Sequence, residues 1–371
     1  SGRTGVAPAR RLLVLEPYFG GSHRAVLDVL LPALELRGWH ADVLTLPARK
    51  WKWRMRGAAI TMAAEAARLH DEGARWDVVF ASTFLNLAEF VALAGDAVAG
   101  VPRVVYFHEN QLLYPNRHTA EWDLQFPLTN ITSALAADLC LFNTRWNMDG
   151  FIGGIPEFLG QFPDHHPTGV AGRIAAKSEV LPPPFDGAPF DAAPVTRGER
   201  CRIVWPHRWE HDKAPEAFFE AVTRLAEEGL DFEVAFAGQP YRETRESFEA
   251  AGAALGGRLV HIGAPESRSD YAALLASADV AVSTADNEFF GLAMIEACYA
   301  GCLALVPDRL AYPELYGAHM RYASNEDLVD RLRSLVIKRP APGQCRLLAE
   351  RYTIDALAPV YAKVLGSLAD R

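Results

Sequence analysis

The sequence lacks the features of several specialised classes of protein. No apolar run approaches the roughly 18 residues that span a bilayer, and the stretch Leu12–Leu15 stops at Glu16, too short for a signal peptide. The 37 Lys and Arg do not balance the 46 Asp and Glu, and the net charge of −9 disfavours a general nucleic-acid coat. The odd number of cysteines, without a CxxC pair, argues against a secreted disulfide framework. We therefore expect a reduced, soluble, cytoplasmic protein. The cysteines are Cys140, Cys201, Cys298, Cys302 and Cys345.

Short apolar runs alternate with longer segments of helical periodicity, which is typical of parallel βαβ units. The 371 residues allow two or three domains of about 150 residues each. The proline-rich segment Leu181–Arg200 continues neither a helix nor a central strand, and it predicts the linker. We expect an α/β protein with two Rossmann-like, doubly wound domains, residues 1–185 and 186–355, facing across a cleft. The predicted strands are Arg11–Glu16, Ala41–Leu46, Trp76–Ala81, Arg103–His108, Asp138–Asn143, Ser178–Leu181, Arg202–Trp205, Phe232–Ala237, Arg258–Ile262, Asp279–Thr284 and Cys302–Val306.

In open α/β sheets ligands bind beyond the carboxyl ends of the strands, so the residues that follow each strand are the candidates. The strongest signal is Glu288-Phe-Phe-Gly-Leu-Ala-Met-Ile-Glu296, after the strand that ends near Thr284. A helix that begins near Gly291 would offer free N–H groups and a positive dipole end to a diphosphate. Glu288 and Glu296 would hold sugar and ribose hydroxyls. The alternative is an ordinary capped helix with an acidic first turn.

A second charged segment, His207-Arg-Trp-Glu-His-Asp-Lys213, follows the first strand of the second half. Arg208 and Lys213 are five residues apart at a strand-to-helix turn, where two cations can flank one diphosphate. A solvated charged loop is the alternative for either cation alone. Because both segments follow strands of the same half, we interpret them as one diphosphate site.

Polar segments also follow strands of the first half. Glu16–His23 contains the turn Gly20-Gly21, which would let a ligand approach the backbone, and Ser22 is expected to cap the next helix. The turn is not GxGxxG, which counts against a dinucleotide site. Tyr106–Gln111 places several polar groups in succession at the end of another strand, although a lone histidine such as His108 is more often structural.

A basic, aromatic run interrupts the acidic chain. The run contains no acidic residue, and its basic and aromatic members are Arg49, Lys50, Trp51, Lys52, Trp53, Arg54 and Arg56. Three interpretations are open: a solvated loop, a membrane-surface anchor, or a site where phosphates meet cations and bases stack on tryptophan, as in a tRNA loop. Asp164-His165-His166 has no further ligand at a useful spacing, so we predict no metal site there.

Glu288 and Glu296, with Arg208 and Lys213 upstream, resemble the donor site of retaining GT-B glycosyltransferases of family 4. The resemblance covers both halves of the chain. It implies the GT-B fold with a C-terminal helix, residues 356–371, that crosses back to the first domain. It also implies use of a nucleotide sugar without a metal, and the sequence contains no DxD motif.

A closer resemblance, to the tRNA-queuosine α-mannosyltransferase family, rests on five blocks that occur in order. The family implies transfer of mannose from GDP-mannose to the cyclopentene diol of queuosine, at the wobble position of an aspartate tRNA. It implies no cofactor, no membrane and no obligatory protein partner. The blocks are EPYFGGSH (Glu16–His23), ARKWKWRMRG (Ala48–Gly57), YFHENQLLYP (Tyr106–Pro115), WPHRWEHDK (Trp205–Lys213) and EFFGLAMIEA (Glu288–Ala297).

Carried onto this sequence, the resemblance implies roles for these residues. Arg208, Lys213 and the N–H groups at the helix start would hold the donor diphosphate, Glu296 the ribose and Glu288 the sugar. His108 would lie near the sugar or the incoming hydroxyl. The implied donor residues are Gly20, Gly21, Arg208, Lys213, Glu288, Phe290, Gly291, Leu292 and Glu296. The implied acceptor residues are His23, Asn110, Gln111 and the basic run, Arg49, Lys50, Trp51, Lys52, Trp53, Arg54 and Arg56.

The expected mechanism is a front-face transfer, in which the phosphate leaves while the acceptor hydroxyl approaches from the same side. Preorganised cations and a helix end would stabilise the charge on the leaving group. An alternative uses Glu288 or His108 as nucleophile or base. Two further hypotheses are a similar enzyme with a lipid or small glycoside as acceptor, and a tRNA-binding protein without catalysis.

Overall fold

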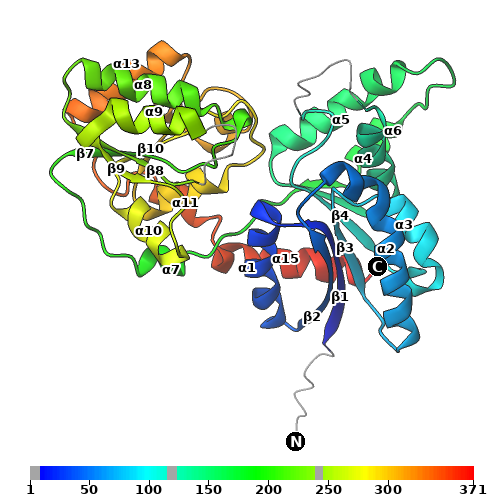
Figure 1. Cartoon of the computed structure of the whole chain (residues 1–371). Coiled ribbons are helices and arrows are strands. Elements are labelled where there is room, and N and C mark those ends of the chain that lie inside the picture. The colour runs from blue at the N-terminus through cyan, green and yellow to red at the C-terminus, as the bar shows by residue number, and fades with distance from the viewer. Residues whose placement is uncertain (1–8, 115–122, 239–244) are drawn as a thin grey trace, which may run out of the picture. The chain divides into compact units, whose positions relative to one another are not determined.

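The computed structural model describes residues 9–114, 123–238 and 245–371 and divides the chain into two compact units (Figure 1). Unit 1 comprises Ser1–Pro184 together with Ile354–Arg371, and unit 2 comprises Phe185–Thr353. The first crossing between them falls after Pro184, within the proline-rich linker that the sequence predicts. The second crossing returns the C-terminal helix to unit 1, as the predicted GT-B fold requires.

Unit 1 is built on a six-stranded parallel sheet in the order β2-β1-β3-β4-β5-β6. The strands are short and separated by helices, because parallel neighbours need a crossover connection. The strands are β1 (Arg10–Phe19), β2 (Trp39–Pro47), β3 (Val78–Ser82), β4 (Arg103–Phe107), β5 (Leu139–Phe142) and β6 (Ser178–Val180). The helices are α1 (Gly21–Glu35), α2 (Trp51–Asp71), α3 (Leu87–Ala94), α4 (Gln125–Ala136), α5 (Arg145–Gly160), α6 (Val170–Ala175) and α15 (Ile354–Ala369), with the 3-10 turn η1 (Gly95–Val98).

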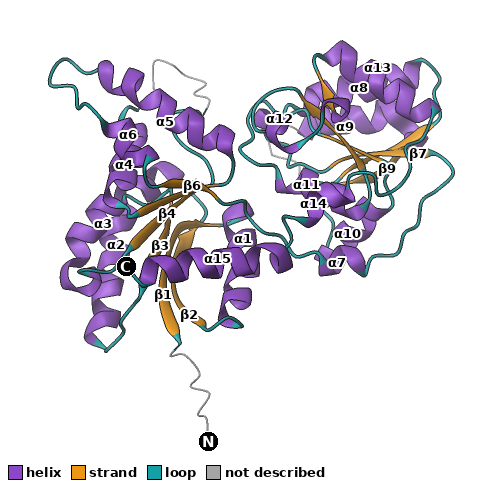
Figure 2. Cartoon of the chain, turned by 180° about the vertical axis from the view of Figure 1, so that it is seen from behind, coloured by secondary structure: helices purple, strands orange, loops and turns teal. Residues whose placement is uncertain are grey.

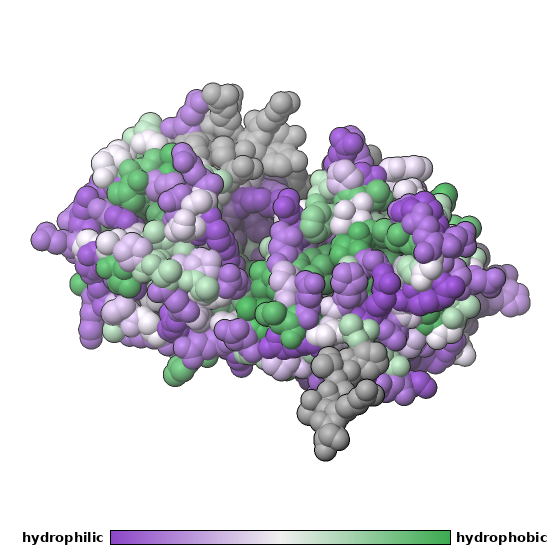
Figure 3. Space-filling model, turned by 90° about the horizontal axis from the view of Figure 1, so that it is seen from below, coloured by the Kyte–Doolittle hydropathy of each residue, from purple (hydrophilic) through white to green (hydrophobic). Residues whose placement is uncertain are grey.

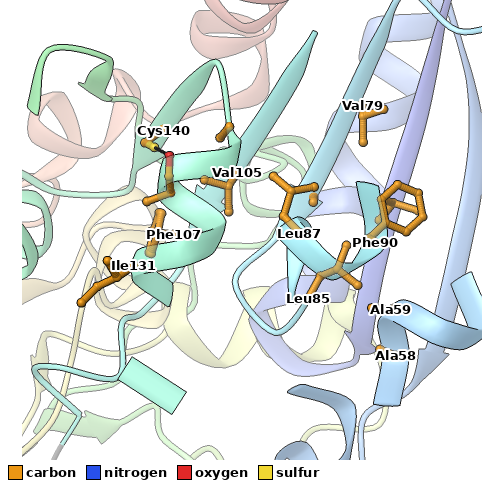
Figure 4. Packing of buried hydrophobic residues seen from close by; sticks show 14 of the residues in the cluster. Ala58, Ala59, Val79, Leu85, Leu87, Phe90, Val105, Phe107, Ile131 and Cys140 are labelled. Carbon is orange, nitrogen blue, oxygen red and sulfur yellow. Dashed lines mark hydrogen bonds between the residues drawn. The ribbon is translucent and has the colours of Figure 1, made fainter. Parts of the chain in front are cut away.

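Alternate residues of each strand point to opposite faces of this sheet, and both faces are buried. On one face Val79, Val105 and Phe107 pack against residues of α2, α3 and α4, as Figure 4 shows. Cys140 belongs to this core and donates its thiol hydrogen to the carbonyl of Ala134 at 3.5 Å. Helices α1 and α15 contact each other and pack on the other face of the sheet, where they bury apolar side chains. One of these is Leu357 of α15, which is 7% exposed.

The C-terminal helix α15 is part of the unit 1 core. Tyr361 is 1% exposed, and its hydroxyl donates to the carbonyl oxygen of Pro182 at 2.9 Å. Leu365 is likewise 1% exposed, and Arg10 of β1 pairs with Asp370 just after the helix at 2.7 Å. Figure 2 shows α15 beside the strands of unit 1, and the Arg10–Asp370 ion pair links the end of the chain to its first strand.

Unit 2 has a second six-stranded parallel sheet, in the order β12-β11-β10-β7-β8-β9. Trp205, Phe218 and Leu332 lie in a core between this sheet and α8 and α13. The strands are β7 (Cys201–Trp205), β8 (Phe232–Phe236), β9 (Leu259–Ile262), β10 (Val280–Val282), β11 (Leu303–Pro307) and β12 (Arg321–Tyr322). The helices are α7 (Ala188–Asp191), α8 (Pro215–Glu227), α9 (Arg245–Leu255), α10 (Arg268–Ala276), α11 (Leu292–Ala300), α12 (Tyr312–Leu315), α13 (Asn325–Ile337) and α14 (Arg346–Glu350), with the 3-10 turns η3 (His211–Lys213), η5 (Gly256–Arg258) and η6 (Ala318–Met320).

The strand orders mark where each unit is suited to bind a ligand. In doubly wound sheets the ligand site lies at the carboxyl edge, where the direction of the strand order reverses. In unit 1 this switch point lies between β1 and β3, and in unit 2 it lies between β7 and β10. The sequence singles out three segments near these points: Glu16–His23 spans the end of β1, His207–Lys213 follows β7, and Glu288–Glu296 comes after the loop that follows β10.

Hydrophilic residues are spread over the face that Figure 3 shows, with hydrophobic residues between them. Among the residues that the structure describes, no helix is both long and apolar enough to cross a membrane.

The packing of α15 leads to a first prediction. Replacement of Leu365 by Ala removes buried methyl groups and leaves a cavity, so we expect the free energy of unfolding to fall by about 2–5 kcal/mol. Val360 in the same helix is 42% exposed, and Val360→Ala is the matched control, with an expected change within about 0.5 kcal/mol. Urea denaturation followed by circular dichroism measures both. Equal stability of the two variants would contradict the placement of α15 in the core.

Candidate active site

In unit 2 the loops after β7 and β10 are joined by hydrogen bonds. The hydroxyl of Thr284 donates to the carbonyl oxygens of Lys213 and Ala214, both at 2.9 Å. The backbone N–H of Asp286 donates to the carbonyl oxygen of Asp212 at 2.8 Å. These bonds place η3 beside the loop that leads into α11. Two segments that are far apart in the sequence therefore form one site.

A partly buried ion pair lies at the centre of this site. The Lys213 ammonium lies 3.0 Å from a carboxylate oxygen of Glu288 and donates to the carbonyl oxygen of Asn287 at 2.9 Å. Burial alone would lower the pKa of Lys213, but Glu288 and Asp212 more than offset it and hold that pKa above its usual value. Burial likewise raises the pKa of Glu288, and the Lys213 charge outweighs it and lowers that pKa. Both groups are charged at neutral pH.

Arg208 is the accessible cation of the site. Its side chain is 64% exposed, and its guanidinium lies 3.2 Å from Glu210, so it is free to turn toward an anion. The structure therefore places both predicted cations at the carboxyl edge of the sheet: Lys213 is held in place, while Arg208 faces solvent.

His207, directly before Arg208, is buried and neutral. Burial, followed by the charge of Lys213, lowers the pKa of His207 to about 3. Its Nε2 has no hydrogen-bond partner among the described residues. A Cβ on Gly238 would lie 1.8 Å from the His207 carbonyl oxygen, so only glycine allows the end of β8 to pass this close.

Helix α11 begins as predicted. Gly291 is its N-cap with φ of 85°, a conformation that favours glycine, and no side chain caps the helix. The N–H groups of Met294 and Ile295 donate to the Gly291 carbonyl, whereas those of Leu292 and Ala293 point out of the helix start and are available to an anion. Phe290 is 3% exposed and packs edge-on against Tyr352, with ring centroids 5.2 Å apart. The buried Phe290 ring therefore anchors the loop to Tyr352 and does not face a ligand.

Glu296 points to a residue that the sequence analysis missed. Its carboxylate is bound by both terminal nitrogens of Arg268, one of them at 3.2 Å. Arg268 lies at the start of α10 and stacks over the rings of Phe190 and Tyr271, with its guanidinium carbon 5.0 and 5.3 Å from their centroids. A ribose would meet Glu296 already oriented by this arginine. No sequence motif connects α10 to α11, so only the fold shows the pair.

In unit 1 a chain of buried polar groups lies at the switch point between β1 and β3. Glu16 accepts hydrogen bonds from the backbone N–H of Tyr18 and the hydroxyl of Ser82, both at 2.9 Å. Its other oxygen lies 3.0 Å from Nδ1 of His23. Nε2 of His23 lies 3.3 Å from Glu109. The sequence analysis named His23 but assigned no role to Glu16 or Glu109, although both belong to its motifs.

Because each ring nitrogen of His23 faces a carboxylate, His23 is an imidazolium. Burial lowers its pKa, but Glu16 and Glu109 more than offset this and raise the pKa to about 10. Glu16, His23 and His108 lie close enough to share a metal ion. Both His23 nitrogens are occupied by hydrogen bonds, however, and metal binding requires a free ring nitrogen. The arrangement favours a proton over a metal at His23. Only 4% of His23 is exposed, so it lies behind the surface and does not line it as an acceptor contact would.

His108 is the neutral partner of His23. The two rings are 4.1 Å apart, and burial, followed by the charge of His23, lowers the pKa of His108 well below its usual value. Its ring also packs on Tyr106, with ring centroids 4.6 Å apart, and its ring nitrogens form no hydrogen bond to a described residue. A neutral imidazole with 8% exposure and unused nitrogens is suited to exchange a hydrogen bond with a hydroxyl.

The glycine turn has a conformational reason. Helix α1 begins at Gly21, whose φ is 54°, and its N-cap is Gly20; the prediction that Ser22 caps the helix is therefore wrong. A Cβ on Gly20 would lie 2.4 Å from Cβ of Ala48, so Gly20 allows β1 and the end of β2 to approach. Their contact with a donor phosphate stays a prediction.

The structure gives Asn110 a structural role in place of the expected acceptor contact. Asn110 is completely buried, and its amide donates to Asn147 at 2.7 Å. Its side-chain oxygen accepts from the backbone N–H groups of Leu112 and Leu113 at 3.0 and 2.9 Å. This leaves no face for a ligand. Gln111 is half-buried, and its contact with the acceptor stays a prediction.

The basic run begins helix α2, and its members differ in exposure. Trp51 is half-buried, with ring centroids 5.0 Å from Phe126 and 6.2 Å from Phe84, whereas Trp53 is 61% exposed. Only Trp53 therefore has a free ring on which a base can stack. Among the cations, Arg56 pairs with Asp123, and Arg54 donates to the carbonyl of Pro47 at 3.1 Å. Within the described part of the chain, no acid pairs with the exposed Arg49, Lys50 and Lys52.

A switch-point cluster in each of two Rossmann-like units, together with the C-terminal helix that returns to unit 1, is typical of a glycosyltransferase of GT-B fold. Residues 191–349 match the family of group 1 glycosyl transferases. Residues 11–185 match the N-terminal domain family of tRNA-queuosine alpha-mannosyltransferases. A protein of Drosophila melanogaster named tRNA-queuosine alpha-mannosyltransferase is 37% identical over 335 residues, 86% of this chain and 85% of that protein. The chain belongs to the tRNA-queuosine alpha-mannosyltransferase family.

Solved structures support the fold alone. HepE of Anabaena, in complex with UDP and glucose, has a TM-score of 0.67 and 13% identity, with 96% of this chain and 100% of that chain covered. A trehalose-phosphate synthase of Burkholderia vietnamiensis has a TM-score of 0.71 and 14% identity, with 98% of each chain covered. Sucrose-phosphate synthase of Thermosynechococcus elongatus has a TM-score of 0.70 and 14% identity, with 97% and 99% covered.

The paired histidines lead to a second prediction. In a pH titration from 5.5 to 9, we expect His23 to stay protonated and His108 to stay neutral, because two carboxylates surround the first and burial beside a positive ring affects the second. Proton–carbon NMR spectra of protein labelled at histidine measure both states. The variants His23→Gln and His108→Gln assign the signals. A midpoint for His23 near 6.5 would show that the carboxylates do not hold its proton.

Proposed function

We propose that the protein transfers mannose, with retention, from GDP-mannose to the cyclopentene diol of queuosine at the wobble position of an aspartate tRNA. The observation that carries the proposal is the site of unit 2, where Lys213, Arg208 and the open start of α11 lie at one switch point. Membership of the family and the name of the Drosophila relative support the sugar and the acceptor.

The proposed donor site divides the nucleotide sugar among groups of opposite charge. Arg208 and Lys213 would neutralise the diphosphate, with N–H groups of α11 beside them. Glu296, oriented by Arg268, would accept hydrogen bonds from the ribose hydroxyls. Glu288 would do the same for the sugar. These two cations supply the positive charge that a metal gives in other transferases, so we propose a reaction without a metal or other cofactor.

We propose a front-face mechanism because the strongest positive groups face the leaving diphosphate. As the glycosidic bond lengthens, negative charge grows on the phosphate oxygen, and fixed cations stabilise it without having to reorganise. The phosphate oxygen then accepts the proton of the attacking hydroxyl. Glu288 is a weak nucleophile here, because its carboxylate is paired with Lys213 at 3.0 Å. His108 would orient the acceptor hydroxyl or the sugar through an unused ring nitrogen.

We propose that the start of α2 binds the tRNA, which also requires that the protein act where tRNA is found, in the cytoplasm. Arg49, Lys50 and Lys52 are exposed and would contact phosphates, and Trp53 would stack on an unpaired base. No protein partner enters the proposal.

The test of the proposed function is direct. The protein is incubated with tRNA that carries queuosine and, in turn, with GDP-mannose and with the UDP and GDP derivatives of other hexoses, and the digested nucleosides are analysed by mass. We expect a mass increase of one hexose on queuosine with GDP-mannose only, and none on tRNA with guanine at the wobble position. Lys213→Ala is the inactive control. Transfer from another nucleotide sugar would show that GDP-mannose is not the donor. The absence of transfer to queuosine with every donor would refute queuosine as the acceptor.

A third prediction separates the donor site from the tRNA surface. Lys213→Ala and Glu296→Ala should weaken binding of GDP at least about tenfold, since each removes a charged hydrogen bond, and should leave tRNA affinity unchanged. Calorimetry with GDP and filter binding with tRNA measure the two.

The complementary variant replaces Arg49, Lys50 and Lys52 by Ala. It should keep GDP affinity and reduce the slope of log affinity against log salt by about 0.7–0.9 for each lost phosphate contact. Arg54→Ala, at a cation that already contacts the backbone, should change the slope less. If both sets of variants weakened the same ligand, the proposed division between the units would be wrong.

A further inference from the structure

The buried network of unit 1 has one member that reaches the surface. Glu16 is 1% exposed and His23 is 4% exposed, whereas the Glu109 side chain is 16% exposed. Glu109 begins the loop after β4, next to His108, and lies at the carboxyl edge of the sheet where a ligand would arrive.

The hydrogen bonds of Glu109 leave acceptor capacity unused. A carboxylate offers about four lone-pair sites. Within the described residues, Glu109 receives the His23 imidazolium at 3.3 Å and the Thr83 hydroxyl at 3.4 Å, both long hydrogen bonds. About two acceptor sites remain, on a carboxylate whose position is fixed from two sides. Glu16, by contrast, receives three hydrogen bonds and is closed to solvent.

A second observation at the same place points to a ligand. His108 is 8% exposed and its ring is neutral and lies 4.1 Å from the His23 ring. The nitrogens of the His108 ring form no hydrogen bond to a described residue. An ionised carboxylate that lacks two donors and an imidazole that lacks a partner are adjacent. Together they match a molecule with neighbouring hydroxyl groups, which donate to the carboxylate and exchange a further hydrogen bond with the imidazole.

We infer that Glu109, held by His23 and Thr83, binds the two adjacent hydroxyls of the acceptor's cyclopentene diol. This inference rests on the proposed function for the identity of the acceptor. A cis-diol donates two hydrogen bonds in nearly one direction, which a single carboxylate can accept with both oxygens. Glu16 acts as a positioning residue, because it keeps the His23 proton that fixes Glu109. The net negative charge of Glu16, His23 and Glu109 together also raises the electron density on the hydroxyl that attacks.

The experiment compares the affinity of the protein for tRNA with queuosine and for the same tRNA with guanine at the wobble position. The wild-type protein should bind the queuosine form about tenfold more tightly, since hydrogen bonds to a charged acceptor have that size. Glu109→Gln replaces one acceptor oxygen by a donor, and the difference between the two tRNAs should fall below about twofold. Binding of GDP should not change. Glu157→Gln, at an exposed carboxylate on α5, is the matched control and should keep the preference.

Glu109→Asp is the second variant, because it keeps the negative charge that His23 needs for folding but withdraws the carboxylate by one methylene. It should also lose the preference, and circular dichroism should show an unchanged fold. Retention of the preference in both variants would overturn the inference, as would a wild-type protein without a preference. The outcomes separate the two proposals. Mannose transfer with a preference that survives Glu109→Gln refutes the diol contact alone. A Glu109-dependent preference without mannose transfer refutes the proposed reaction alone.

Discussion

The ion pair between Lys213 and Glu288 is the interaction on which the candidate site of unit 2 depends. Each residue comes from a loop that follows a different strand, and neither loop would hold its position alone. Burial of a charged group without a partner of opposite charge costs free energy. Removal of either Lys213 or Glu288 would therefore leave the other as an unpaired, partly buried charge and destabilise its position. The two charges balance each other, so the pair as a whole is neutral. In the proposed function, a bound diphosphate would compete with Glu288 for Lys213, and Glu288 would then be free to accept hydrogen bonds from hydroxyl groups of the sugar.

The same constraint acts on the charged group of unit 1, with the opposite sign. In unit 1 a single imidazolium, His23, lies between Glu16 and Glu109, so the group carries one net negative charge. In unit 2 the exposed group is the cation Arg208. A parallel sheet sends all its strand ends to one edge, and the switch point opens a space between two of the loops there. The topology therefore brings the charged residues of each cluster together at one edge of the sheet, and the identity of these residues sets the net charge of the cluster.

Much of the fold follows from local patterns in the sequence. The apolar runs predicted eleven strands and the linker, because a buried parallel strand is a short continuous apolar run. The strand β12 (Arg321–Tyr322) was missed, since two residues carry no pattern. Of the site, the residues next to strand ends were predicted, and Arg268 was not, because its contact with Glu296 joins two helices that no motif connects. Burial was beyond the sequence as well: Asn110 and Gln111 look alike in a polar run, yet only Asn110 is enclosed by its neighbours.

The start of α2 shows how exposure decides between the interpretations that composition leaves open. A helix anchored in a membrane surface presents a broad apolar face to the lipid. The apolar face of α2 instead packs against the sheet, and Met55 and Met62 on this face are 3% and 2% exposed. On its outer side the large exposed apolar residues are Trp53 and Ile60. One accessible aromatic ring beside exposed cations gives little area for lipid but suits a stacked base flanked by phosphates. The built surface thus favours RNA over a membrane, in agreement with an acceptor that is part of a tRNA.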